Sequence, residues 1–222
     1  MTINKTIGRG DKGSRYWIQQ LVNNKSKSLN KELSKIDSSI QEVKWISPLE
    51  TDNYIELKTE DIPDMAKKFN INISIPDSIM DFWPQSGPYW DAVGIDNNGY
   101  LILVECKAHR AETRSSCRAI STKSKSKIRE AMKSTCNEIT GTDIFPENVW
   151  FNEYYQMATK LCFLHHLNKN GIKVKLLFLN IIDDPTFIRT TIAEWERHYN
   201  IIFNKMFEKE VDLDNVIILN YK

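Results

Sequence analysis

The chain has 222 residues, a length that suits one domain with a substantial core. Its composition, 41% hydrophobic and 27% charged, is that of an ordinary globular protein. The net charge of +1 excludes a molecule that attracts nucleic acid over its whole surface, so any such surface must be local. No apolar run approaches the roughly 20 residues that a membrane-spanning helix needs.

The cysteines and the first residues indicate the compartment. The four cysteines are scattered without a C-x-x-C pair, which argues against a zinc ribbon: Cys106, Cys117, Cys136 and Cys162. Free buried cysteines suit a reducing cytoplasm. Residues 1–5 lack the apolar core of a signal peptide. We therefore expect a cytoplasmic protein.

Hydrophobic periodicity predicts the elements of the first half of the chain. In order, we expect a helix over 15–24 capped by Ser14, a second helix near 29–40, a strand over 43–46, a helix-like segment over 51–69 interrupted at Pro63, and an ordered loop over 71–90.

Three charged residues then lie in two apolar, strand-like runs. Asp91 lies in the run 90–94, and Glu105 and Lys107 lie in the run 101–107. Burying an unpaired charge costs several kcal/mol, roughly, so charges at such positions indicate ion pairs or a bound metal. Residues 101–104 are continuously apolar, as in a strand buried on both faces.

The turn between these runs decides whether the charges meet. Asn97-Asn98-Gly99 is typical of a hairpin. A two-residue turn would point Asp91 and Glu105 to opposite faces, whereas a three-residue loop with its glycine in the left-handed region would place them opposite each other. Glu105 and Lys107 share a face in any register. We predict the three-residue register, or a bulge with the same effect.

Two neighbouring carboxylates and a lysine indicate a particular chemistry. A divalent cation relieves the repulsion between carboxylates, and hard oxygen ligands suit Mg²⁺ or Mn²⁺. Lys107 would lie close enough to reach a bound phosphate or the attacking water. These are the parts that metal-assisted hydrolysis of a phosphodiester requires.

Asp91 together with Glu105-Cys106-Lys107 resembles the Asp…Glu-x-Lys signature of the PD-(D/E)XK nuclease superfamily. Pro88 precedes Asp91, but Pro-Tyr-Trp-Asp departs from the strict Pro-Asp dipeptide. A wider similarity, to a bacterial family without an established function that is assigned to this fold, runs through three segments: 45–49, 82–84 and 87–91. The resemblance implies an α/β, restriction-endonuclease-like three-layer core, a mixed β-sheet flanked by helices, in a single domain over 1–222.

The resemblance also implies roles for individual residues. Asp91 and Glu105 would hold Mg²⁺ or Mn²⁺, the backbone carbonyl of Cys106 would complete the metal shell, and Lys107 would assist. Several nucleases of this fold place a glutamine from a nearby helix at the active site, and Gln156 is the candidate.

Many of these nucleases use one more acid from the first helical region. The first predicted helix has no glutamate, which leaves Glu32, Glu42 and Glu56. We favour Glu56, because its surroundings are most similar to the bacterial family.

A polar stretch over 108–127 carries the basic patch of the chain. Its arginines and lysines, with those just beyond it, are Arg110, Arg114, Arg118, Lys123, Lys125, Lys127, Arg129 and Lys133. The patch has two interpretations: a flexible arm that contacts phosphates, or a solvated loop. Beyond it we expect helices near 128–139, 147–168 and 188–206, and strands over 174–182 and 216–219.

The sequence thus favours a metal-dependent nuclease, with DNA as the expected partner and a homodimer compatible with the resemblance. Two alternatives remain: a catalytically inactive nuclease-fold module that binds nucleic acid or a protein partner, and a phosphodiesterase acting on small molecules.

Overall fold

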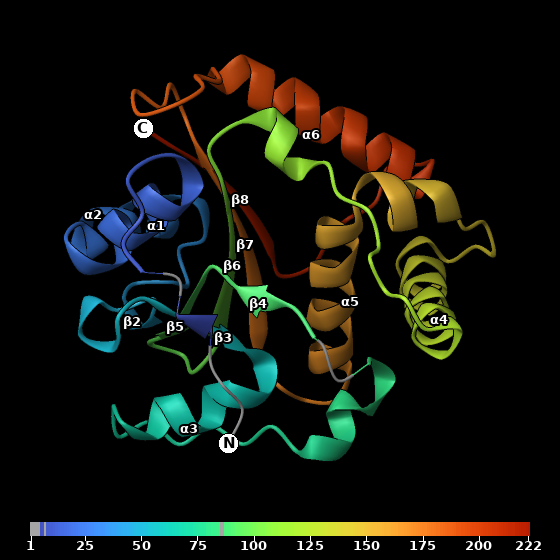
Figure 1. Cartoon of the computed structure of the whole chain (residues 1–222), viewed down its shortest axis with the longest axis horizontal. Helices are drawn as coiled ribbons and strands as arrows, with labels where there is room; N and C mark the ends of the chain where they lie inside the picture. The colour runs from blue at the N-terminus through green and yellow to red at the C-terminus, as the bar shows by residue number, and fades with distance from the viewer. Residues whose placement is uncertain (1–4, 7, 85–86) are drawn as a thin grey trace.

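A mixed five-stranded sheet forms the centre of the protein (Figure 1). The computed structural model describes residues 5–6, 8–84 and 87–222. The sheet order is β2 (Val43–Ser47), β5 (Ala92–Asp96), β6 (Leu101–Lys107), β7 (Val174–Ile181) and β8 (Val216–Tyr221). The first three strands pair antiparallel, and β6, β7 and β8 pair parallel.

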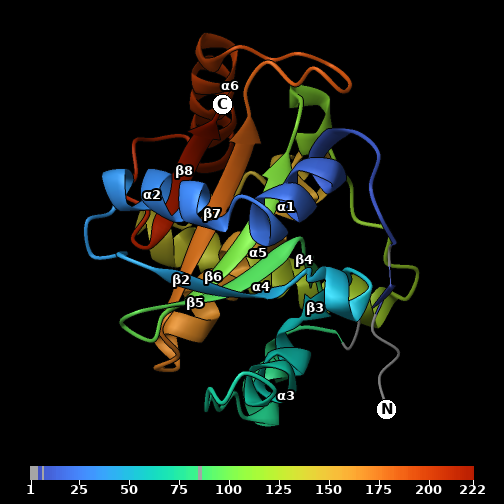
Figure 2. The same ribbon diagram turned by 90° about the vertical axis from the view of Figure 1, so that its left-hand side faces the viewer.

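Helices cover both faces of this sheet (Figures 1 and 2). On one face lie α1 (Gly13–Asn23) and α2 (Ser26–Ile36). On the other lie α5 (Tyr155–Lys169) and α6 (Ile192–Phe207), with α4 (Thr122–Thr140) packed against α5. The predicted α/β class, with a mixed sheet flanked by helices, is confirmed. No helix in the described part of the chain is long and apolar enough to cross a bilayer.

The side chains of β6 alternate between two hydrophobic cores. Ile102, Val104 and Cys106 pack with α1 and α2, whereas Leu101 and Leu103 pack with α5. The prediction of a strand buried on both faces is therefore confirmed. Since strands repeat every two residues, positions 105 and 107 continue the face that α5 covers.

The hairpin between β5 and β6 has the predicted three-residue loop. Ala92 pairs with Val104, and the same register brings Asp96 opposite Tyr100, where the Asp96 amide donates to the Tyr100 carbonyl over 2.9 Å. Gly99 has a φ of 79°, in the left-handed region that glycine adopts without strain.

Asp91 directly precedes Ala92, the last residue of this register. The regular pairing ends there, because the Asp91 amide donates over 3.0 Å to the carbonyl of Val104, the residue that faces Ala92. The carboxylate of Asp91 thus lies at the end of the ladder, beside the backbone of β6.

A second sheet contributes to the same end of β6. It contains β1 (Lys5–Thr6), β3 (Ile55–Lys58) and β4 (Tyr89–Trp90), in that order. All three pair antiparallel. Because β4 directly precedes β5 in the chain, this sheet reaches the site from the side of β5.

The helix-like segment predicted over 51–69 is wrong. The region holds two short 3-10 turns, η1 (Glu50–Asp52) and η2 (Thr59–Asp61), the strand β3, and the short helix α3 (Ile62–Lys67). Asn53 and Tyr54 both have positive φ, which no α-helix accommodates. Pro63 lies in the first turn of α3, where its missing N–H costs nothing, so it begins a helix instead of interrupting one.

Three further boundaries differ from prediction. Lys12 occupies the N-cap position of α1, and Ser14, the predicted cap, lies in the first turn. The second helix spans 26–36 instead of 29–40. The predicted loop over 71–90 contains a 3-10 helix, η3 (Asp77–Phe82), and β4; residues 85–86 lie outside the described part of the chain.

The helix predicted over 147–168 is divided. A π-helical turn, η5 (Val149–Glu153), precedes α5, and Tyr154 between them has a φ of −130°. The extended chain at Ser115 forms a parallel bridge to Tyr154. This long-range pairing breaks the helix and fixes where α5 begins.

The basic stretch after β6 is not a free arm. It contains a 3-10 turn, η4 (Arg110–Thr113), and the first turns of α4, whose N-cap Ser121 accepts from the Ser124 amide. The amide of Cys117 donates over 2.9 Å to a carbonyl of η5. The flexible-arm interpretation is therefore corrected to an ordered segment.

Candidate functional site

A cavity of about 350 Å³ lies between the end of β6, the loop before β5 and the first turns of α5. Every residue predicted for the site lines this cavity: Glu56, Asp91, Glu105, Cys106, Lys107 and Gln156. The fold brings together side chains from four separate parts of the chain.

Each element has a local reason to present its side chain. Leu57 of β3 pairs with Trp90 of β4, and continuing that register places Glu56 opposite Asp91. Glu32, one of the alternatives for the additional acid, instead pairs with Lys35 on α2 and does not line the cavity.

The break before α5 positions Gln156 in the first turn of that helix. The Gln156 amide donates to the Ser115 hydroxyl over 2.8 Å. Its side-chain oxygen accepts from the Lys107 ammonium over 3.3 Å. The glutamine therefore contacts the lysine of the Asp…Glu-x-Lys signature.

Asp91 is held by the strand that it faces. Its Oδ2 accepts a 2.7 Å hydrogen bond from the Cys106 amide. Burial, and next the Glu105 carboxylate, raise the pKa of Asp91 to about 7, against the partial compensation of Lys107 and Lys160. Glu56 adds to the repulsion. The negative charge at Asp91 is thus incompletely neutralised by the protein.

Glu105 has the opposite character. Its side chain is 6% exposed, and one oxygen lies 2.5 Å from Lys107 Nζ while the other lies 3.0 Å from Lys160 Nζ. Burial disfavours its charge, but the two ammonium groups outweigh burial and lower its pKa to about 2. For Lys107, burial would lower the pKa, but Glu105 and Asp91 raise it above its usual value. Lys107 is therefore a permanent cation.

Sequence reasoning missed Lys160, which it assigned only to a polar stripe of the helix. The side chain is 3% exposed, and its ammonium donates to the Tyr89 carbonyl and lies 4.1 Å from the centre of the Trp90 ring. No sequence signal marks it, although its neighbours at positions 157–159 and 161–164 of α5 are all buried in the structure. A lysine there must have partners for its charge.

Cys106 points away from the cavity, as predicted. Its side chain is 1% exposed and packs in the core under α1 and α2. Burial raises the pKa of its thiol well above the ordinary value, so it is not a reactive thiolate. Only its backbone is available to the site.

The donor set fits a hard divalent cation. Mg²⁺ commonly takes one or two protein carboxylates, with waters and substrate oxygens completing the shell. Asp91 and Glu105 supply two carboxylates, and burial together with the neighbouring Glu105 charge raises the pKa of Asp91. In the described part of the chain, no three acidic, histidine or cysteine side chains are grouped closely enough to form a complete protein cage. Two carboxylates are the number that Mg²⁺ commonly takes from a protein when substrate oxygens and waters complete its shell.

Compared with known proteins, the chain matches no family model, no curated protein and no solved structure. The resemblance to the PD-(D/E)XK superfamily stays a prediction from the residues.

Proposed function

We propose that this protein is a metal-dependent nuclease of the PD-(D/E)XK type that hydrolyses phosphodiester bonds of nucleic acid, with DNA as the first substrate to test. The observation that carries the proposal is the cavity at the end of the β5–β6 hairpin, which Asp91, Glu105 and Lys107 line together. A structural ion pair would require only the glutamate and a lysine, not a second acid with a raised pKa.

The topology supports a restriction-endonuclease-like core. A helix precedes three antiparallel strands, and further helices lead to a fourth strand that pairs parallel with the third. This is the order expected of the nuclease core. Glu105 and Lys107 lie on the third of these strands, Asp91 lies directly before the second, and Gln156 lies on the helix before the fourth. Glu56 comes from β3 of the second sheet.

The chemistry divides between the carboxylates and the lysine. Asp91 and Glu105 would hold Mg²⁺ or Mn²⁺, and the Cys106 carbonyl would add a third oxygen. When bound, such an ion lowers the pKa of a coordinated water and polarises the phosphate. Hydrolysis would join the water oxygen to phosphorus and break the bond to the ester oxygen, while the proton lost by the water would reach the leaving oxygen through solvent.

Lys107 stabilises the charge that develops on the phosphoryl oxygens. Because its pKa is raised, it stays protonated and does not act as a general base. Gln156 fixes the direction of the ammonium through the 3.3 Å contact. Glu56, opposite Asp91, is the nearest further acid for a second ion or for the attacking water.

One observation favours an alternative, a catalytically inactive nuclease-fold module that binds nucleic acid or a protein partner. Both oxygens of Glu105 already accept from lysines, so this carboxylate is satisfied without a metal. In that case the site would be an internal ion-pair network, and its remaining function would be binding.

Calorimetric titration with Mn²⁺ tests the metal site, with wild type beside Asp91→Asn and the Asp91→Ala/Glu105→Ala double variant. Asp91→Asn keeps an oxygen that can accept from the Cys106 amide but removes the charge. We expect binding in wild type and its loss in both variants, with Asp64→Asn on exposed α3 as the matched control.

Cleavage of single- and double-stranded DNA and RNA completes this test. Asp91→Asn and Lys107→Met should abolish cutting while circular dichroism stays unchanged. A folded variant that cuts as well as wild type would contradict the site. Nucleic-acid binding without any cleavage by wild type would favour the inactive module.

A further inference from the structure

Lys160 is the least exposed charged group in the candidate site. Its ammonium has three partners on two strands: Glu105 Oε2 of β6 at 3.0 Å, and, from β4, the Tyr89 carbonyl and the face of the Trp90 ring at 4.1 Å. The side chain also lines the cavity, so the ammonium lies between a buried carboxylate and the space where a ligand would bind.

This placement conflicts with metal binding by Glu105. One oxygen of Glu105 accepts from Lys107 and the other from Lys160, so a divalent cation that binds Glu105 competes with both ammonium groups. Lys160 keeps the Tyr89 carbonyl and the Trp90 ring as partners when it loses Glu105, and Lys107 keeps Gln156 Oε1. Lys160 can therefore give up its oxygen of Glu105 without becoming an unpaired buried charge.

The balance of charge indicates what happens to Lys160 afterwards. The cavity has three acids, Glu56, Asp91 and Glu105, against two lysines. A divalent cation reverses this balance from one net negative charge to one net positive charge. The excess positive charge, with the ammonium of Lys160 released into the cavity, favours an anion.

We propose that Lys160 is a built-in counter-cation that occupies Glu105 in the free protein and passes to a phosphate of the substrate when a divalent cation binds. The cation and a phosphodiester then bind cooperatively, so the protein holds its metal weakly until substrate arrives. This inference rests on the proposed metal site but not on the identity of the substrate.

The test uses Mn²⁺ calorimetry with and without dimethyl phosphate, the smallest phosphodiester. For wild type, dimethyl phosphate should tighten Mn²⁺ binding by roughly tenfold, within the usual range of coupling between two sites. Lys160→Met, of similar length but uncharged, should bind Mn²⁺ more tightly than wild type without phosphate and lose most of the dependence on dimethyl phosphate.

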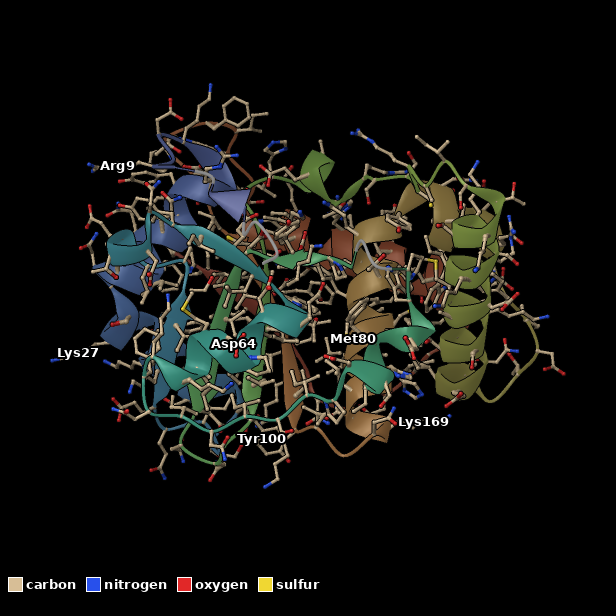
Figure 3. All side chains as sticks on the ribbon, turned by 60° about the horizontal axis from the view of Figure 1, so that its bottom comes forward. Arg9, Lys27, Asp64, Met80, Tyr100 and Lys169 are labelled. Atoms are coloured by element: carbon tan, nitrogen blue, oxygen red, sulfur yellow. The ribbon has the colours of Figure 1, made fainter. Side chains whose placement is uncertain are left out.

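The matched control is Lys169→Met, on the same helix but outside the cavity. Lys169 pairs with Glu138, and Figure 3 shows it at the C-terminal end of α5. This variant should keep both the wild-type affinity and its dependence on dimethyl phosphate. Lys160→Gln serves as the second variant should Lys160→Met fail to fold.

Two outcomes overturn the inference. One is a wild-type affinity for Mn²⁺ that dimethyl phosphate leaves unchanged. The other is a folded Lys160 variant that keeps the wild-type affinity and phosphate dependence. Failure of the proposed function would give a different result. If Mn²⁺ and dimethyl phosphate bind cooperatively but no nucleic acid is cleaved, the role of Lys160 is supported and the proposed nuclease activity is contradicted.

Discussion

Asp91 and Glu105 are neighbouring carboxylates with opposite acidities. Glu105 contacts two ammonium groups directly, whereas Asp91 accepts from a backbone amide and faces the charge of Glu105. The pKa of Glu105 is accordingly lowered to about 2, and that of Asp91 is raised to about 7. Near neutral pH, Asp91 is therefore the group that a proton and a metal ion compete for.

This difference predicts how stability depends on pH without metal. The pKa of Asp91 is raised in the folded protein, so protonated Asp91 contributes to the free energy of unfolding. This contribution is fully present below the ordinary pKa of 3.8 and is lost as pH rises toward about 7. Asp91→Asn lacks this loss, so its stability relative to wild type should increase between pH 4 and 7 and then level off. Screening by water on the open side of the cavity limits the gain to roughly 1–2 kcal/mol.

Urea unfolding in the presence of a chelator, at several pH values, measures this gain. Asp64→Asn is the control, since Lys67 lowers the pKa of Asp64 and its removal should give no such increase. A constant difference between Asp91→Asn and wild type from pH 4 to 8 would contradict the raised pKa of Asp91.

At the scale of single residues, the sequence indicates candidate site residues where a charged side chain interrupts an apolar run. Asp91, Glu105 and Lys107 stand out because their strand neighbours are apolar. Lys160 does not stand out, because one face of an amphipathic helix is expected to be polar. Its burial depends on the Trp90 ring and the Tyr89 carbonyl, which no spacing within the helix reveals.

At the scale of elements, the central sheet depends on a close approach between β2 and β5. A Cβ added to Gly94 would lie 2.4 Å from Val43 Cγ1 and 2.9 Å from Trp45 Cε3, and both belong to β2. The side chains of Val43 and Trp45 therefore occupy the space that a Cβ at position 94 would need.

Gly94→Ala should consequently destabilise the protein by about 1–3 kcal/mol, the usual cost of overpacking. Val43→Ala/Gly94→Ala should recover part of that loss, since the smaller side chain makes room for the added methyl group. Urea denaturation of the three proteins measures this coupling. If Gly94→Ala and wild type are equally stable, β2 can move enough to accommodate the added methyl group, and the prediction is wrong.

Some boundaries of helices and strands can be predicted from neighbouring residues in the sequence, and others cannot. The hairpin register depends on Asn97-Asn98-Gly99, a local signal that the sequence alone displays. The division of the helix at Tyr154 was not predicted, because it results from pairing with Ser115, 39 positions away in the chain. The strand β3 was missed for a similar reason, since its partners are the distant β1 and β4.

At the scale of the whole molecule, a net charge of +1 requires a local surface for any nucleic acid. The basic segment is partly neutralised, because Arg110, Arg114 and Arg129 pair with Glu194, Glu153 and Glu147 respectively. Among described residues, the lysines at the start of α4 have no ion-pair partner: Lys123, Lys125 and Lys127.

These lysines lie near the entrance to the candidate site. Lys127 lines a hollow that shares Trp83 and Gly87 with the site cavity. Lys127 therefore connects the first turns of α4 to the cavity, across a hollow that Glu60, Asp77 and Asp81 also line. A nucleic-acid strand lying on it would bring a phosphate toward Lys107 and Lys160.

Neutralising Lys123, Lys125 and Lys127 to glutamine should weaken DNA binding and make it less sensitive to salt. Each phosphate contact contributes about 0.9 to the slope of log affinity against log salt concentration on duplex DNA, so the triple variant should lose up to about 3. The control is Lys27→Gln/Lys31→Gln on α2, since Figure 3 shows Lys27 on the side of the molecule away from α4. Fluorescence anisotropy at several salt concentrations measures the DNA affinity of the α4 variant and of the α2 control. An unchanged slope in the α4 variant would mean that this basic surface is only solvated and that the substrate reaches the site another way.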